Sequence, residues 1–123
     1  MNSATNIVNQ QKMFLHLQRV VAIDFKDLRT NDIILIRTQN TCYSFVITSA
    51  DGMHGKLSSA SQNDFFSEAV LFGSLVKEQE EEQIFVSRLE PQSHALFVVQ
   101  QGSQLLKMIT SLITGLCCVR PIA

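Results

Sequence analysis

The sequence predicts a mainly β protein: a small antiparallel domain of about six to seven strands, barrel-like or a sandwich, with an N-terminal helix. Runs of β-branched and aromatic residues at 33–36 and 43–48 suit the pleated, half-buried surface of a sheet. Asp51-Gly52 follows them, and this dipeptide is typical of tight hairpin turns because both residues tolerate positive φ. The 123 residues are enough for one domain with its own core.

The first 24 residues form a segment distinct from the β domain, which we place at residues 25–123. Residues 4–21 carry apolar side chains at helical spacing, so this N-terminal segment is predicted to be partly helical or disordered. The apolar residues on one side of that helix are Met13, Phe14, Leu17, Val20 and Val21. Residues 20–25 can equally pass into a strand, and a polar turn at 26–32 opens the β domain.

Three strands at residues 33–36, 43–48 and 53–59 form a predicted meander, with turns at 39–41 and at Asp51-Gly52. A two-residue turn sets this register: Ala50 opposite Met53, Val46 opposite Leu57, and Phe45 opposite Ser58. In that register apolar side chains project from both faces of the sheet. A closed barrel or sandwich covers one face, and we expect the N-terminal helix or another subunit to cover part of the other. The sequence therefore predicts a homo-oligomer.

The middle of the chain adds a loop, further strands and an acidic segment. Residues 58–63 are predicted to be a polar loop, followed by a strand at 68–76 in which Gly73 indicates a bulge or bend. The glutamates within residues 77–83 repel one another, so this segment is predicted to be exposed, as a loop or a short helix end. Strands at 84–89 and 95–100 follow, the first ended by a proline and the second by a glycine turn.

The last segment, residues 105–119, admits two structures. Its apolar residues recur at helical spacing, which favours an amphipathic helix. Its β-branched residues, the interruption at Gly115 and the turn at Gly102 favour strands, with residues 105–110 pairing back on 95–100. We predict strands. The segment is also shorter than the roughly 20 apolar residues that cross a bilayer, so no membrane helix is expected.

Charge and cysteine usage restrict the class of protein. Ten basic and eleven acidic residues give a net charge of -1, which disfavours strong nonspecific binding to nucleic acid or to an acidic membrane surface. Cys42, Cys117 and Cys118 form no CxxC pair, so we interpret all three as reduced thiols. The N-terminus is polar and lacks an export signal, and the sequence therefore predicts a cytoplasmic protein.

No motif predicts a metal site or a cofactor. His16, His54 and His94 have no histidine or cysteine partner at ligand spacing. Residues 52–56, Gly-Met-His-Gly-Lys, do not match a P-loop, which needs four residues between its glycines. They do not match a KH-type loop either, because that loop belongs to a helical setting.

Catalysis would need a nucleophile beside a base. Ser74 lacks the Gly-x-Ser-x-Gly frame of an acyl-transfer elbow. Cys117 and Cys118 lie in an apolar run, where thiols are usually inert. A hydrolase or thiol enzyme would require one of these three residues beside His54 or His94.

Phe65 and Phe66 are the first candidate binding site. Two adjacent aromatic residues in a polar setting can form an exposed anchor for a partner or a platform on which bases stack. The alternative is a loop plug that closes one end of the barrel.

Arg37, Asn40 and Tyr43 surround the first turn and are the second candidate site. They can bind a phosphate or a single-stranded base, as small oligomeric barrels of the Sm type do near their strand turns. The structural alternatives are an ion pair of Arg37 with Asp32 or Glu68, a turn-holding role for Asn40 and a core position for Tyr43.

Several short motifs carry a family resemblance: Asp27-Leu28, Arg37-Thr38-Gln39-Asn40-Thr41 with Tyr43, Phe65-Phe66, Gly73-Ser74 and Thr110-Ser111. In these motifs, residues 25–119 resemble a group of small uncharacterised bacterial all-β proteins with no assigned activity. The resemblance implies a single barrel-like domain with strands at its C-terminus, and it implies no function. The chain departs from that group at Asn31-Asp32, where a Gly-Asp turn is usual, in its N-terminal segment and in an acidic insertion at 78–82.

We expect a non-enzymatic, self-associating β-barrel-like structural or binding module, because two-faced apolar strands occur without a catalytic constellation. The first alternative is a single-stranded RNA-binding, Sm-like barrel that uses Arg37, Asn40 and Tyr43. The second is an unrecognised hydrolase or thiol enzyme.

Overall fold

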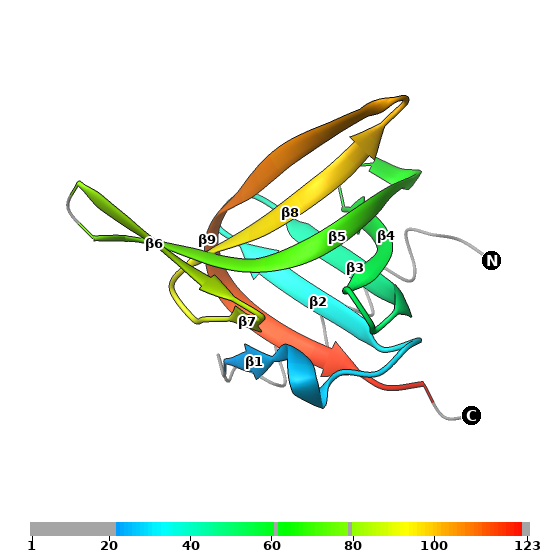
Figure 1. Ribbon diagram of the computed structural model, residues 1–123, viewed down its shortest axis with the longest axis horizontal. Coiled ribbons are helices and arrows are strands. Elements are labelled where there is room, and N and C mark those ends of the chain that lie inside the picture. The colour runs from blue at the N-terminus through cyan, green and yellow to red at the C-terminus, as the bar shows by residue number, and fades with distance from the viewer. Residues whose placement is uncertain (1–21, 61, 79, 122–123) are drawn as a thin grey trace.

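The computed structural model of the protein describes residues 22–60, 62–78 and 80–121. Its strands are β1 (Ile23–Asp24), β2 (Ile33–Thr38), β3 (Cys42–Ser49), β4 (His54–Ser59), β5 (Gln62–Glu78), β6 (Glu81–Val86), β7 (Arg88–Leu89), β8 (His94–Gln101) and β9 (Gln104–Val119). A 3-10 turn, η1, covers Phe25–Asp27. The fold is 71% strand and contains a closed six-strand antiparallel barrel with extra strands (Figure 1). The predicted barrel is confirmed.

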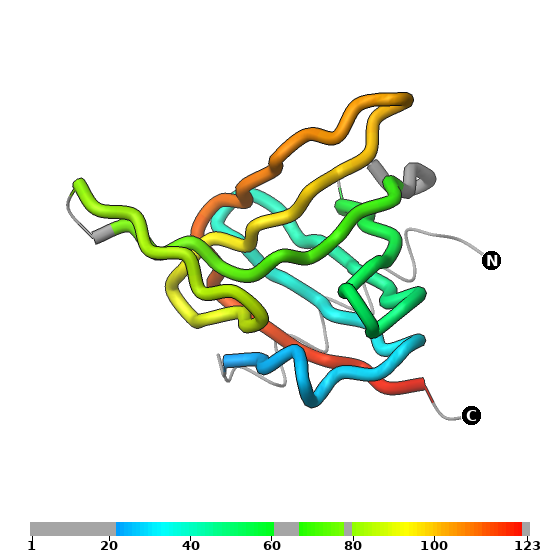
Figure 2. Tube along the Cα trace, in the orientation of Figure 1, coloured from blue at the N-terminus to red at the C-terminus, as the bar shows by residue number. Residues whose placement is uncertain are grey.

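The barrel strands follow the order β4-β3-β2-β9-β8-β5, and β5 pairs back on β4 to close the barrel. β5 pairs with β8 along one edge and divides its other edge between two strands. β4 pairs with residues up to Val70, and β6 pairs from Gly73 onward. Beyond Leu75, where the pairing of β5 with β8 ends, the tip of the β5–β6 hairpin leaves the barrel wall, as the ribbon and the chain trace both show (Figures 1 and 2).

Alternate residues of the barrel strands face inward and form the main apolar core. Phe45 pairs with Ile34 on one side and with Leu57 on the other. Its ring meets that of Phe97 edge to face, with centroids 5.4 Å apart and planes at 61°. Gly55 leaves the space for this ring, because a Cβ there would lie 2.7 Å from Phe45 Cζ. The core thus depends on a missing side chain as well as on large ones.

Apolar residues also occupy the outer face of the β2–β9 pair. Leu35 lies opposite Cys117, and both side chains are buried, with Ile33 and Val119 packed against them. Because Leu35 alternates with two inward-facing isoleucines, its side chain lies outside the barrel. β2 therefore carries apolar side chains on both faces.

The β3–β4 hairpin differs from the predicted register by one residue. Its turn covers residues 50–53 instead of two residues, and Phe45 lies opposite Leu57. Met53, at the end of the turn, has a positive φ of 54° and is buried in the core. This register buries Leu57 and leaves Lys56 in solvent, whereas the two-residue turn would have reversed them.

Two predicted loops are wrong. The predicted loop at 58–63 is a short connection, because β4 runs to Ser59 and β5 begins at Gln62. In the acidic segment at 77–83, residues 77–78 end β5 and residues 81–83 begin β6, so these residues form strands instead of a loop or a helix end. Glu81 and Glu82 are exposed, as predicted, because strand residues on a projecting hairpin reach water.

The two ends of the chain have different outcomes. The predicted C-terminal strands are confirmed by β9, which pairs with β8 in the predicted hairpin. The predicted helix at residues 4–21 lies outside the described residues. No α-helix occurs among the residues that are described, so the helical part of the predicted fold is not supported. Ile23–Asp24 form a strand that pairs with β7, which agrees with the strand alternative given for residues 20–25.

Candidate functional site

The ends of β4 and β6 meet along one edge of β5, and a pocket lies at this seam. On one side of the seam Leu71 N–H donates to Met53 O at 3.1 Å, and on the other Ser87 N–H donates to Phe72 O at 3.3 Å. Phe25 N–H donates to Ser87 O at 3.0 Å, which brings η1 to the same place. The pocket has a volume of about 440 Å³. This is within the size range of small-ligand sites.

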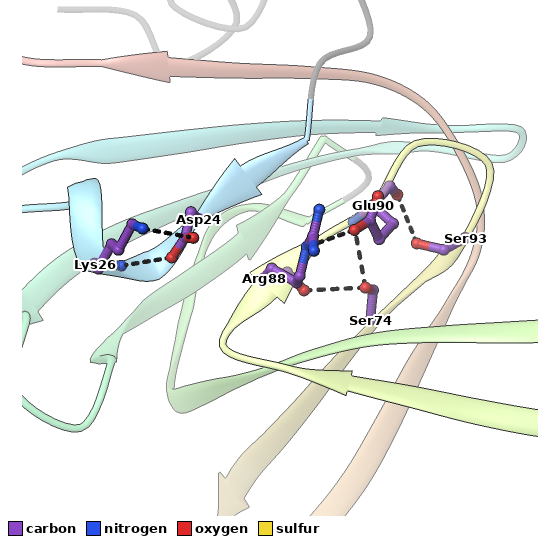
Figure 3. Close-up of polar contacts among 6 residues, drawn as sticks. All are labelled: Asp24, Lys26, Ser74, Arg88, Glu90 and Ser93. Carbon is purple, nitrogen blue, oxygen red and sulfur yellow. Dashed lines mark hydrogen bonds and ion pairs between the residues drawn. The ribbon is translucent and has the colours of Figure 1, made fainter.

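The pocket has apolar walls and a polar rim. The walls include Phe25, Met53, Val70, Leu71, Phe72 and Val86. At the rim, Lys26 N–H donates to Asp24 Oδ1 at 3.1 Å, and Lys26 Nζ lies 3.7 Å from Asp24 Oδ2 (Figure 3). Both side chains are well exposed, so this ion pair adds little stability. The arrangement suits an apolar group better than a charged one.

A buried serine fixes the segment beside the pocket. The Ser74 hydroxyl donates to Arg88 O at 3.0 Å and accepts from Glu90 N–H at 3.2 Å (Figure 3). Ser93 Oγ donates to Glu90 O at 2.6 Å. The Ser74 bonds hold β7 against β5, and Leu89 of β7 is fully buried in the core.

Three large apolar side chains lie exposed next to the pocket, and we call them the hairpin strip: Phe72, Ile84 and Val86. Their exposed fractions are 48%, 54% and 60%. Ile84 and Val86 are two residues apart in β6 and therefore share one face of the hairpin. Phe72 and Val86 also line the pocket. The strip and the pocket form one continuous apolar surface.

The register aligns further residues with this surface. Val86 pairs with Gly73, Gly73 with Leu96, and Leu96 with Ile109, so one row crosses β6, β5, β8 and β9. Leu96 in the middle of this row is buried, whereas Ile109 is 40% exposed and Leu105 further along β9 is 71% exposed. Large exposed apolar patches on soluble proteins mark interaction sites. The hairpin strip with its pocket is therefore the candidate site.

Arg37, Asn40 and Tyr43 do not form a common site. Arg37 is exposed on the outer face of β2, whereas Tyr43 pairs with the inward-facing Ile36 and packs against the core. Burial raises the pKa of Tyr43. Asn40 is exposed in the turn, where its N–H donates to Thr38 Oγ1 at 3.3 Å. The ring that would stack on a base therefore lies on the opposite face of the sheet from Arg37.

Phe65 and Phe66 lie within β5, so they are part of a strand and not of a loop. Their side chains lie outside the described part of the structure. The anchor and the plug that these residues suggested both stay predictions.

The candidate nucleophiles are engaged elsewhere or weakly acidic. Ser74 is fully buried, and its hydroxyl donates a hydrogen bond to a backbone carbonyl. His94 Nδ1 lies 2.8 Å from Thr110 O. Burial raises the pKa of both Cys117 and Cys118, so these thiols are protonated at neutral pH and are poor nucleophiles. Among the described residues, no hydrogen bond joins any of the three to a histidine.

Searches for two other kinds of site gave no candidate. Over residues 22–60, 62–78 and 80–121, no group of three or more His, Cys, Asp or Glu side chains is arranged to hold a metal ion. In that same part of the chain, no helix has the length and apolar character needed to span a bilayer.

The ion pair suggested between Arg37 and Asp32 is not formed, because Arg120 takes that place. Arg120 Nη2 donates to Asp32 Oδ2 at 2.9 Å. A second, smaller pocket of about 350 Å³ lies beside Arg120, with Asp27 and Cys118 among its lining residues. The guanidinium is already bound by Asp32 and by Asp27 O, so it serves the fold.

Reasoning from sequence missed the hairpin strip. Ile84 and Val86 alternate within a predicted strand, which shows that they share a face. The alternation does not show that β6 has a neighbour on one side only. That feature depends on the irregularity in β5 between Leu71 and Gly73, which is distant in sequence from Ile84 and Val86.

Comparisons of the chain with protein family models, with curated proteins and with solved structures found no match. The case for a function therefore rests on the hairpin strip and its pocket. The resemblance to small bacterial all-β proteins stays a prediction.

Proposed function

We propose that the protein is a non-enzymatic β-barrel binding module that self-associates through its hairpin strip. The observation that carries this proposal is the exposure of Phe72, Ile84 and Val86 beside an apolar pocket. Each of these side chains gains roughly 1–2 kcal/mol if its remaining surface is removed from water. Three such residues in one patch favour association of two copies over a lone molecule in water.

The distribution of polar groups supports binding over catalysis. At the rim of the pocket, the charged side chains of Asp24 and Lys26 are exposed and pair with each other. Ser74, the buried hydroxyl nearest the site, holds two backbone groups. Such a surface can bind apolar side chains without altering them chemically.

Single-stranded RNA binding has less support. Arg37 and Asn40 are exposed and can contact a phosphate. Tyr43, the aromatic ring needed for stacking, packs against the barrel core. The net charge of -1 supplies no field to attract a polyanion.

Light scattering coupled to gel filtration tests the proposal. We expect the full chain to form a dimer or a larger oligomer at micromolar concentration, and Val86→Glu to shift it to the monomer. The matched control is Gln83→Glu, which places the same charge in β6 on the opposite face. A monomeric wild-type chain at high concentration would end the proposal. Equal effects of the two glutamates would show that charge on the hairpin matters and the strip does not.

A further inference from the structure

β6 is an edge strand. Within the described seven-stranded sheet, each barrel strand has neighbours on both sides, whereas β6 pairs with β5 alone. Its other edge presents backbone N–H and C=O groups that another strand can bind. Natural edge strands usually avoid such pairing by means of charged residues, proline or bulges. Residues 81–86 contain no proline, their register with β5 is regular, and the charged residues among them, Glu81 and Glu82, lie at the tip end of the strand.

The hydrogen-bonding direction of each β6 residue follows from one contact. Ser87 N–H donates to Phe72 O and so points toward β5. Backbone groups alternate in direction along a strand, so those of Phe85 and Gln83 also point toward β5. The groups of Ile84 and Val86 then point to the open edge. These are the residues whose side chains are exposed in the hairpin strip.

We propose that β6 pairs antiparallel with β6 of a second copy of the chain, around a two-fold axis at Ile84. This inference rests on the proposed self-association and specifies its geometry. Ile84 then lies opposite the same residue of the second copy, and each donates its outward N–H to the other. Glu82 lies opposite Val86, and Glu80 lies toward Arg88. The two-fold axis makes the interface isologous, as in most dimers.

The charges of the hairpin favour the antiparallel orientation. The acidic residues Glu80, Glu81 and Glu82 lie at the tip, whereas Arg88, which follows the other end of β6, forms an ion pair with Glu90 of the same chain (Figure 3). Antiparallel pairing places the acidic tip of one copy beside this neutral pair of the other. Parallel pairing would place the acidic residues side by side, which is destabilising.

A proline substitution tests the backbone contact. Ile84→Pro removes the outward N–H and leaves the inward groups that bind β5, and proline is tolerated on edge strands. Ile84→Thr keeps that N–H and the β-branched shape but replaces the ethyl group of the side chain with a hydroxyl. We expect Ile84→Pro to weaken dimerisation about tenfold to a hundredfold in sedimentation velocity. Ile84→Thr is expected to weaken it several-fold less, with both variants keeping the wild-type melting profile.

Cross-linking tests the register without relying on the proline variant to fold. In a Cys118→Ser background, Ile84→Cys brings two thiols onto the two-fold axis, with Cα atoms about 5.5 Å apart, within the range of a disulfide. Mild oxidation with oxidised glutathione, which is reduced as the two thiols form a disulfide, is expected to give a covalent dimer. The control is Val86→Cys, whose two copies lie four residues apart along the paired strands, about 13 Å, and are not expected to cross-link.

The outcomes separate this inference from the proposed function. A dimer that Val86→Glu disrupts but Ile84→Pro does not, with no cross-link through Ile84→Cys, overturns edge pairing and leaves self-association through the strip in place. Equal weakening by Ile84→Pro and Ile84→Thr also overturns it, because the side chain would then explain the effect. A monomeric wild-type chain overturns both. A covalent dimer through Ile84→Cys alone supports the pairing.

Discussion

Arg120 and Asp32 form a two-point hydrogen bond that joins the segment after the last strand to the start of the first barrel strand. Arg120 Nε and Nη2 donate to the two carboxylate oxygens of Asp32 at 3.0 and 2.9 Å. Asp32 is 1% exposed and also accepts from Arg29 N–H at 2.9 Å. The Arg120 guanidinium holds the pKa of this carboxyl below its ordinary value, against the opposing effect of burial. A carboxylate so deeply buried persists because it is paired.

Removing the charge of Asp32 is therefore expected to destabilise the fold. Asp32→Asn keeps the shape of the side chain but gives Arg120 and Arg29 N–H a weaker, uncharged acceptor. We expect the free energy of unfolding to fall by about 1–3 kcal/mol in urea denaturation. Asp27→Asn is the control, because its side chain is exposed and its carbonyl still accepts from Arg120. A control loss as large as that of Asp32→Asn would mean that the buried pair has no special role.

The same pair predicts how stability depends on pH. Because the pKa of Asp32 is lower in the folded chain than its ordinary value of 3.8, the unfolded chain binds the proton more readily. The stabilisation is complete well above pH 3.8 and is lost progressively as the pH falls through the folded-state pKa. We expect the wild type to lose more stability than Asp32→Asn between about pH 5 and pH 2.5. Parallel pH profiles for the two proteins would contradict this account.

The barrel could be predicted from sequence because local sequence patterns indicate its strands. Runs of β-branched residues, the Asp51-Gly52 turn and the bulge at Gly73 each depend on only a few neighbouring residues. The register of the β3–β4 hairpin could not be predicted, since it depends on whether Met53 finds room in a core built by distant strands.

The candidate site is harder to predict from sequence for a related reason. Ile84 and Val86 are as apolar as core residues, and their exposure follows from where β4 stops along the edge of β5. The partner of Asp32 is a residue 88 positions away, Arg120, and no local pattern connects them. Contacts between distant segments decide both features.

Gly73 is expected to be essential for the hairpin that carries the strip. Its φ of 155° is rarely adopted by residues with a side chain, and a Cβ at this position would lie 2.1 Å from Phe85 O. Gly73→Ala must therefore push β6 away from β5. We expect a loss of about 2 kcal/mol or more in the free energy of unfolding, together with loss of self-association. Chemical denaturation and light scattering measure the two effects.

Gly102 provides the matched control for that substitution. It also has a positive φ, 59°, but a Cβ there meets nothing within 4 Å. Gly102→Ala is expected to cost about 1 kcal/mol from backbone strain alone and to leave the oligomeric state unchanged. If the two alanine variants behave alike, backbone conformation explains the cost and the contact with Phe85 does not.

RNA binding at the turn between β2 and β3 is not expected. Arg37 is exposed and Tyr43 faces inward, so a single strand finds a charge at this turn without the ring on which a base would stack. In fluorescence anisotropy at low salt, we expect Arg37→Ala to leave any binding of a single-stranded oligonucleotide unchanged. Arg29→Ala, which removes another exposed arginine, is the control. Salt-sensitive binding that Arg37→Ala abolishes and Arg29→Ala retains would instead establish the turn as a nucleic-acid site, because a phosphate contact at Arg37 would then suffice without stacking.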